Sequence, residues 1–255
     1  MQVLYGQSAQ AVCVSIVFTI LLAASTEAKT PAGCSDDKLR VAVDIGHTEI
    51  NGGALSARGV REYLFNSRFA RELVAEARTK PTLHLFLVSP SDSNVGLKER
   101  PRLAALKGAA VFLSIHHDSA QLKYFRSWMF MGEEKKQAVG IRGYSLFVSK
   151  GSPEFALSTA LARGIGSKFL AAGATPTLHH AEPIEGENRD LIDPKRGVYE
   201  APFAVLRLAQ MPAVLIEVGV IANKDDEEQL NSRKYRSTLQ QAILSALSYF
   251  CSASM

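Results

Sequence analysis

The chain has 255 residues, of which 47% are hydrophobic and 21% are charged. This composition excludes a disordered chain, a collagen-like chain and a disulfide-stapled miniprotein, and the length suits one large domain or two small ones. The formal net charge is +4, and the basic residues are scattered without any run of five or more. A dedicated nucleic-acid binder normally carries a basic stripe, so we expect no nucleic-acid partner.

The N-terminal segment predicts export. Residues 11–24 form an uncharged, mostly apolar run of 14 residues, which is shorter than the roughly 20 residues of a membrane-spanning helix. Small residues follow the run up to Ala28, as in a secretory signal, although no Lys or Arg precedes it. We predict a signal peptide at residues 1–28 and an exported mature chain at residues 29–255 without a membrane span. A buried N-terminal helix is the alternative.

Two cysteines, Cys34 and Cys251, remain in the predicted mature chain, one near each end. An even number of cysteines in an exported protein suggests a disulfide bond. Two unrelated buried thiols are the alternative. The spacings match no cysteine zinc motif.

Strand-like and helix-like segments alternate along the mature chain. Apolar runs rich in β-branched residues predict strands, and apolar residues at helical spacing predict helices. In chain order we expect a strand at 39–44, a helix at 62–77, a strand at 82–88, a helix at 97–107, strands at 109–115 and 144–149, a helix at 153–172 with Ser152 as its N-cap, a helix at 199–208, a strand at 213–218 and a helix at 234–250. This order predicts a single α/β domain with a doubly wound, mostly parallel twisted sheet and helices on both faces.

Ionisable side chains follow three of the predicted strands directly. They are His47, His116 and Glu217, while Glu62 begins the first predicted helix. Open α/β sheets carry their sites beyond the carboxyl ends of the strands. We therefore expect these four side chains to converge at one rim of the sheet.

Two imidazoles and one carboxylate are a frequent set of catalytic zinc ligands, which leaves a fourth position for water. Zinc lowers the pKa of that water towards about 7. Glu217 ends an apolar strand, so burial would raise the pKa of its carboxyl group and suit it to proton transfer. The alternative is that each histidine is an ordinary polar residue and that Glu62 only complements the helix dipole.

Four segments carry a more specific signal. Residues 41–66 contain an aspartate–x–glycine–histidine motif, a glycine-rich loop and a glutamate, and residues 96–120 contain a leucine–x–x–arginine motif before serine–isoleucine–histidine. Together with residues 142–149 and 196–230, they resemble the zinc-dependent N-acetylmuramoyl-L-alanine amidases of bacterial cell walls, the type-3 amidase family. These segments span most of residues 38–250.

The resemblance implies a role for each residue of the expected rim. It places the zinc ligands on His47, Glu62 and His116, and the catalytic carboxylate on Glu217. The chain departs from the family at residues 48–49, where two glycines are usual. No ligand is lost by this departure.

The resemblance also implies an activity. The reaction would be zinc-assisted hydrolysis of the amide between N-acetylmuramic acid and L-alanine of the stem peptide, with peptidoglycan as substrate. The protein would then be periplasmic or extracellular and associated with the cell wall. Another zinc peptidase, of the carboxypeptidase-like kind, and an inactive wall-binding protein with the same fold are the alternatives.

Residues 176–197 form a stretch of 22 residues with little apolar periodicity. Loops longer than about 12–15 residues in a compact domain are usually functional or disordered. Some members of the resembled family carry a segment here that covers the site until a protein activator displaces it. We hypothesise a gating loop with Glu185 or Glu187 as a further metal ligand; a solvated loop beside the groove is the alternative. The sequence leaves the roles of His179 and His180 open, although paired histidines in a loop are usually solvated.

Overall fold

The computed structural model describes Met1 and residues 38–89 and 94–252. The predicted signal peptide, apart from Met1, and the predicted bond from Cys34 to Cys251 lie outside what is described. Within the described residues, no helix is long and apolar enough to cross a membrane.

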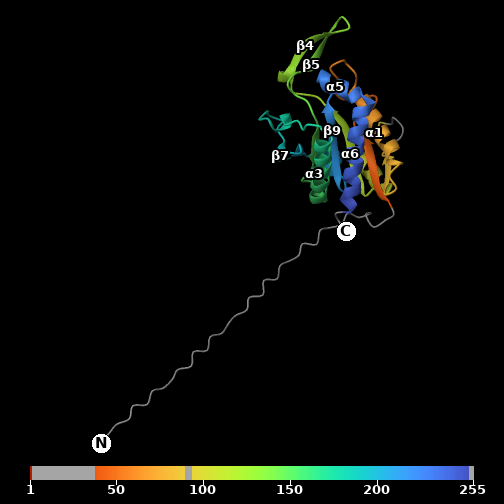
Figure 1. Cartoon of the computed structure of the whole chain (residues 1–255), viewed down its shortest axis with the longest axis vertical. Helices are drawn as coiled ribbons and strands as arrows, with labels where there is room; N and C mark the ends of the chain where they lie inside the picture. The colour runs from red at the N-terminus through yellow and green to blue at the C-terminus, as the bar shows by residue number, and fades with distance from the viewer. Residues whose placement is uncertain (2–37, 90–93, 253–255) are drawn as a thin grey trace.

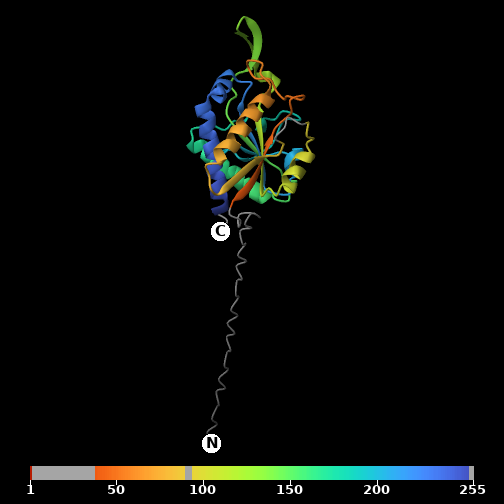
Figure 2. The ribbon, with the colours of Figure 1, turned by 90° about the vertical axis from the view of Figure 1, so that its right-hand side faces the viewer.

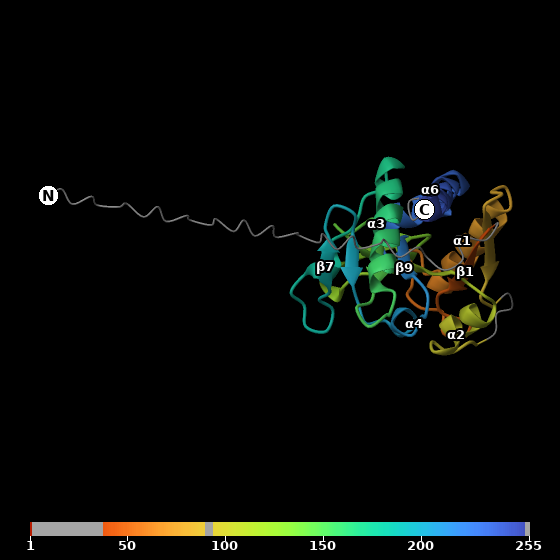
Figure 3. The ribbon, with the colours of Figure 1, turned by 90° about the horizontal axis from the view of Figure 1, so that it is seen from below.

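A seven-stranded sheet forms the centre of the fold (Figures 1 and 3). Its strands run in the order β2 (Leu83–Leu87), β1 (Leu39–Ile45), β3 (Val111–Asp118), β9 (Ala213–Val220), β6 (Ser145–Val148), β8 (Val198–Glu200) and β7 (Asp190–Asp193). The first four strands are mutually parallel. Strand β6 is antiparallel to β9 and parallel to β8, and β7 is antiparallel to β8. The mostly parallel sheet expected from the sequence is therefore confirmed.

Helices cover both faces of this sheet, as Figure 3 shows. One face is covered by α1 (Glu62–Ala77), α3 (Phe155–Ala171) and α6 (Arg233–Ser252), and the other by α2 (Glu99–Leu106) and α4 (Ala204–Arg207). Helix α5 (Lys224–Asn231) follows β9. Its N-cap is Asn223, whose side chain accepts hydrogen bonds from the backbone N–H groups of Asp225 and Asp226. Sequence analysis missed this helix.

Apolar side chains on alternate sides of each strand build two core layers. In β1, Val41 and Val43 pack with the α1–α3–α6 layer, whereas Ala42 between them packs with the α2–α4 layer. Strand β3 follows the same pattern, with Leu113 on the first side and Phe112 on the second. Strands covered on both faces are nearly continuous apolar runs, which explains why periodicity alone could find them.

The structure corrects two expected helices. The helix expected at 199–208 is wrong, because its first part forms strand β8 and only Ala204–Arg207 is helical. Tyr199 stacks on Phe147 in the core and donates a hydrogen bond to the carbonyl of Thr177. The helix expected at 153–172 begins at Phe155, with Glu154 rather than Ser152 as its N-cap.

A two-stranded hairpin of β4 (Phe125–Phe130) and β5 (Glu133–Ala138) extends from one end of the molecule (Figures 1 and 2). Its two turn residues, Met131 and Gly132, both have positive φ angles, as in the type I′ turns that join hairpin strands. Methionine is an unusual residue for this position, so residues 131–132 carry no recognisable turn signal. Two short 3₁₀ helices, Leu122–Tyr124 and His179–Ala181, complete the described elements.

Two leucines of α1 give a matched test of the core. The side chain of Leu73 is 0% exposed and that of Leu64 is 56% exposed. We expect Leu73→Ala to lower the free energy of unfolding by about 2–5 kcal/mol, because it removes buried contacts and leaves a cavity. Leu64→Ala should change it by less than about 0.5 kcal/mol. Urea unfolding followed by circular dichroism measures both, and equal losses would contradict the described packing.

Candidate metal centre

The loop after β1 holds His47 in an unusual backbone conformation. Gly46 donates its N–H to the carbonyl of Ile115 at 2.9 Å, which continues the pairing with β3. His47 then adopts a φ of 65°, in the left-handed region that few residues other than glycine occupy. The guanidinium of Arg100 donates a hydrogen bond to the His47 carbonyl at 2.7 Å and helps to hold this conformation. Backbone strain of this kind is concentrated at functional sites.

Glu62 lies between two imidazoles. It is the first residue of α1 and is 4% exposed. Its Oε2 lies 3.0 Å from His47 Nε2, and its Oε1 lies 3.0 Å from His116 Nδ1. The backbone N–H of Ala54 donates to Oε2, and the Asn66 side chain donates to Oε1. The backbone N–H of His117 also donates to Oε1, at 3.3 Å, so each carboxylate oxygen has one imidazole and at least one fixed hydrogen-bond donor.

Burial alone would raise the pKa of the Glu62 carboxyl group, but hydrogen bonds with His116 and His47 hold it below its ordinary value. The carboxylate therefore stays ionised next to two nitrogen donors. This combination of oxygen and nitrogen ligands is typical of catalytic zinc sites.

The space around the three side chains fits a metal ion. One ligand atom from each of His47, Glu62 and His116 lies within 4.8 Å of the others. Ligands on a tetrahedral ion with bonds of about 2.0–2.1 Å would be separated by about 3.4 Å, close to the observed spacing. A Cβ atom at Gly46 would overlap the His116 ring, and one at Gly53 would overlap Glu62 Oε2. Glycine at both positions keeps the cluster open.

The neighbouring histidine on β3 has a different role. His117 is buried, its Nδ1 lies 2.7 Å from Asn66 Oδ1, and its ring packs against Phe65 and Phe69. Burial lowers the pKa of this imidazole to about 3. Because successive strand residues point to opposite faces, only His116 of the two faces Glu62.

Glu217 lies beside this cluster on β9, where it is the register partner of His116. Its Oε2 is buried and has no hydrogen-bond partner among the described residues. Burial raises the pKa of the Glu217 carboxyl group well above its ordinary value, and the negative charges of Asp118 and Glu62 raise it further. The site thus pairs an ionised carboxylate, Glu62, with one that readily holds a proton.

A buried ion pair supports the rim from below. Asp44 Oδ1 lies 3.0 Å from Arg100 Nη1, and Asp44 Oδ2 accepts a hydrogen bond from the Ser114 hydroxyl. Arg100 also donates to the carbonyls of Ile45 and Val95. Sequence analysis gave no role to Asp44, Arg100 or Asn66. The first two do belong to the aspartate–x–glycine–histidine and leucine–x–x–arginine motifs, and Asn66 lies one helical turn after Glu62.

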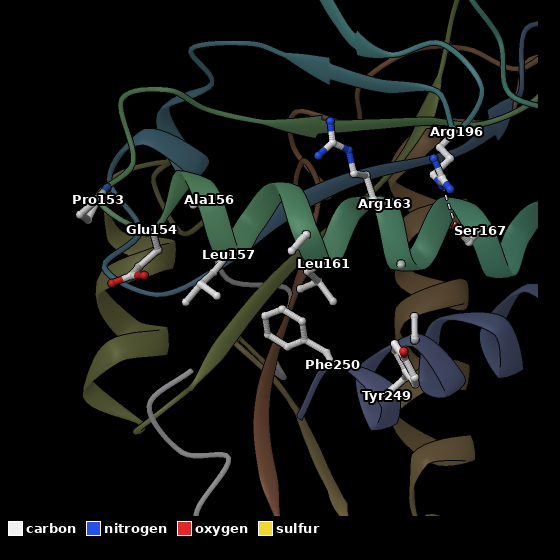
Figure 4. A pocket seen from close by; sticks show the side chains of 13 residues that line it. Pro153, Glu154, Ala156, Leu157, Leu161, Arg163, Ser167, Arg196, Tyr249 and Phe250 are labelled. Carbon is white, nitrogen blue, oxygen red and sulfur yellow. Dashed lines mark hydrogen bonds between the residues drawn. The ribbon is translucent and has the colours of Figure 1, made fainter. Parts of the chain in front are cut away.

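A cavity of about 480 Å³ lies at this rim, and its lining includes His47, His116, Arg100 and Glu217. A larger cavity of about 680 Å³ lies between α3 and α6 (Figure 4), where side chains such as Leu161 and Phe250 line it. The larger cavity has no histidine in its lining. The smaller one therefore combines space with reactive groups.

The segment at residues 176–197 is more ordered than its composition suggests, because it contains a 3₁₀ helix and strand β7. The structure shows where His179 and His180 lie, which the sequence left open, and neither is a freely solvated loop residue. His179 is buried, with its Nδ1 2.8 Å from Thr177 Oγ1. His180 is half-buried and forms a hydrogen bond with the Asp118 carboxylate.

The two candidate gating carboxylates, Glu185 and Glu187, are both exposed. Neither belongs to a potential metal-binding group of the described residues. Glu187 lines a neighbouring cavity that also contains Glu217. The structure therefore does not bring Glu185 or Glu187 to the His47–Glu62–His116 cluster.

Solved structures with the same fold are amidase catalytic domains. The catalytic domain of the amidase CwlV from Bacillus (Paenibacillus) polymyxa matches with a TM-score of 0.63 and 24% identity, covering 83% of this chain and 97% of that one. The amidase Ami1 of Mycobacterium smegmatis matches with a TM-score of 0.66 and 20% identity, covering 86% of this chain and 100% of that one. These likenesses confirm the fold.

Sequence relatives carry amidase names. The chain is 25% identical over 230 residues to a probable N-acetylmuramoyl-L-alanine amidase, AmiB, of Haemophilus influenzae, covering 83% of this chain and 52% of the relative. It is 25% identical over 241 residues to the amidase AmiC of Neisseria meningitidis, covering 92% of this chain and 58% of the relative. The chain thus spans little more than half the length of these relatives. Residues 41–249 match the family described as N-acetylmuramoyl-L-alanine amidase, and the chain belongs to this family.

Proposed function

We propose that this chain is a zinc-dependent hydrolase that cleaves the amide between N-acetylmuramic acid and L-alanine of the stem peptide in peptidoglycan. The observation that carries the proposal is the position of Glu62 between His47 and His116, together with the buried Glu217, whose carboxyl group has a raised pKa. Family membership supplies the reaction class. Zinc is the proposed ion because two imidazoles and a carboxylate are a known catalytic ligand set for it.

The chain's own residues would divide the work. His47, Glu62 and His116 would hold the zinc, which supplies Lewis-acid polarisation of a carbonyl and a water of lowered pKa. Glu217 would accept a proton from the attacking water and return it to the leaving amine of L-alanine. A raised pKa makes the ionised Glu217 carboxylate a stronger base for the first step. The protonated carboxyl group is still acidic enough to give its proton to the leaving amine in the second step.

The proposed substrate places the protein outside the cytoplasm. A relative from Staphylococcus epidermidis, 25% identical over 215 residues, is named a probable cell wall amidase. We propose accordingly that residues 29–255 are the exported catalytic domain, associated with the cell wall. A solved neighbour, the amidase CwlD from Clostridioides difficile, is in complex with the GerS lipoprotein. A protein activator for this chain and gating by Glu185 or Glu187 stay predictions.

Product analysis tests the proposed reaction directly. Purified peptidoglycan digested by the mature protein should release intact stem peptides that begin with L-alanine and leave the glycan strands uncut. Mass spectrometry separates this result from the alternatives. Release of single amino acids would indicate a carboxypeptidase-like enzyme, and binding without any product would indicate a wall-binding protein. Either result would overturn the proposal.

Replacing a proposed ligand should remove the metal. We expect His116→Ala to lose the zinc equivalent of this site and the activity together, because only Glu62 and His47 would remain as ligands. His84→Ala is the matched control, since His84 is exposed on β2 and belongs to neither potential metal-binding group of the described residues. Inductively coupled plasma mass spectrometry measures the zinc. Full occupancy in His116→Ala would disprove the ligand assignment.

Glu217→Gln should separate catalysis from metal binding. The amide has nearly the same shape but cannot accept the proton, so we expect zinc content to persist while turnover falls by about 10²–10⁴-fold. Turnover within threefold of wild type would show that Glu217 is not the proton carrier.

The same variant has a second, catalysis-independent readout in the metal-free protein. The pKa of Glu217 is higher in the folded than in the unfolded chain, so between the two values the folded state binds more protons and the free energy of unfolding falls as pH rises. Glutamine does not titrate, so the Glu217→Gln variant lacks this fall in the free energy of unfolding with rising pH. We expect the variant to be more stable than wild type near pH 7 and equal to it near pH 4. Equal stability at both pH values would contradict the raised pKa.

A further inference from the structure

A second cluster of ligand-type side chains lies next to Glu217, and none of its members is proposed to hold the catalytic zinc or to carry the proton. It consists of Asp118, His179 and His180, whose ligand atoms all lie within 4.8 Å of one another. Asp118 is the last residue of β3, whereas the two histidines begin the 3₁₀ helix His179–Ala181. The fold therefore joins two segments that are distant in the sequence.

Both imidazoles face the same carboxylate oxygen. Asp118 Oδ2 lies 2.6 Å from His180 Nε2 and 3.5 Å from His179 Nε2. The two rings lie side by side, with centroids 3.9 Å apart and planes inclined by 36°. The backbone N–H of Ser119 donates to the other oxygen, Oδ1, which leaves Oδ2 facing the histidines.

His179 is prepared to act as a ligand. Its Nδ1 lies 2.8 Å from Thr177 Oγ1, as in metal sites where a hydrogen bond to one ring nitrogen orients the other towards the ion. Burial lowers the pKa of this imidazole to about 4, with Asp118 opposing the shift, so the ring is neutral at neutral pH. A neutral imidazole offers a lone pair to a metal.

The space beside the cluster contains acceptors without donors. A cavity of about 280 Å³ is lined by Asp118, His179, His180, Gln121 and Glu217 among others. Gln121 Oε1 and Glu217 Oε2 are buried and have no hydrogen-bond partner among the described residues. A buried acceptor such as Gln121 Oε1 is costly without a partner, and a bound cation would supply one.

Arg189 also lines this cavity and keeps its positive charge, but its guanidinium does not occupy the acceptors of the cavity. It donates to the carbonyls of Gly186 and Asn188 within its own loop. The acceptors of the cavity therefore stay available to a ligand.

A simple aspartate–histidine hydrogen bond explains only part of this arrangement. It accounts for His180, but His179 is 5% exposed and its Nε2 is too far from Asp118 for a good hydrogen bond. The spacing of 3.5 Å is close to the roughly 3.4 Å between two ligands of a tetrahedral ion. Two imidazoles favour a transition metal over an ammonium group, because imidazole nitrogen is a preferred ligand of such ions.

We propose that Asp118, His179 and His180 bind a second divalent transition-metal ion of the zinc class, separate from the His47–Glu62–His116 cluster. Glu217 lines the cavities of both sites. The second ion would fasten the 3₁₀ helix of residues 179–181 to the end of β3 and form one wall of the site.

Metal stoichiometry of the mature protein tests this proposal without any activity measurement. Stripped protein is titrated with Zn²⁺, and the bound metal is counted by inductively coupled plasma mass spectrometry. We expect two equivalents in the wild type and in the control His84→Gln, and one in His180→Gln or Asp118→Asn. His47→Gln should also bind one, and His47→Gln combined with His180→Gln should bind none.

The variants distinguish this proposal from the proposed function. One equivalent in the wild type that His180→Gln keeps and His47→Gln loses would overturn the second site and leave the proposed function intact. One equivalent that His47→Gln keeps and His180→Gln loses would support the second site and count against the proposed catalytic metal. Circular dichroism of each variant excludes loss of metal through unfolding, and Asp118→Asn keeps the shape of the side chain it replaces.

Discussion

The arrangement of the site depends on the burial of one carboxylate, that of Glu62. An ionised carboxylate removed from water is stable only when its oxygens are paired and hydrogen-bonded. Glu62 has His47 and His116 on its two oxygens, together with donors from Ala54 and Asn66. These groups come from the loop after β1, from α1 and from the end of β3. The pairing and hydrogen bonding of the Glu62 carboxylate oxygens therefore fix the relative positions of these three parts.

The rest of the fold supplies a rigid base for this rim. The α1–α3–α6 layer packs on one face of the sheet, as Figure 3 shows. This packing fixes the position of α1, and therefore of its first residue Glu62, relative to the sheet. The buried pair of Asp44 and Arg100 braces the loop that carries His47. Strand β9 then places Glu217 beside His116 through direct strand pairing. The reactive groups thus lie at the edge of a packed core, on or next to elements that are buried and hydrogen-bonded.

Sequence reasoning could find the sheet and the rim because both leave local signals. Buried parallel strands are apolar runs, and each functional residue of the rim comes directly after such a run or begins a helix. It could not find features set by distant partners. Val198–Glu200 is a strand because Tyr199 packs on Phe147, and His179 and His180 are held by Asp118 and Thr177. No local pattern reveals such contacts, and a Met–Gly turn gives no hairpin signal.

The central claim is that the buried Glu62 carboxylate assembles a metal site with His47 and His116. Anomalous diffraction at the zinc absorption edge, from crystals of the zinc-loaded protein, tests it most directly. The account predicts an ion about 2.0–2.2 Å from a nitrogen of each histidine and from an oxygen of Glu62. An empty position there, in crystals that hold zinc at other side chains, would contradict the claim.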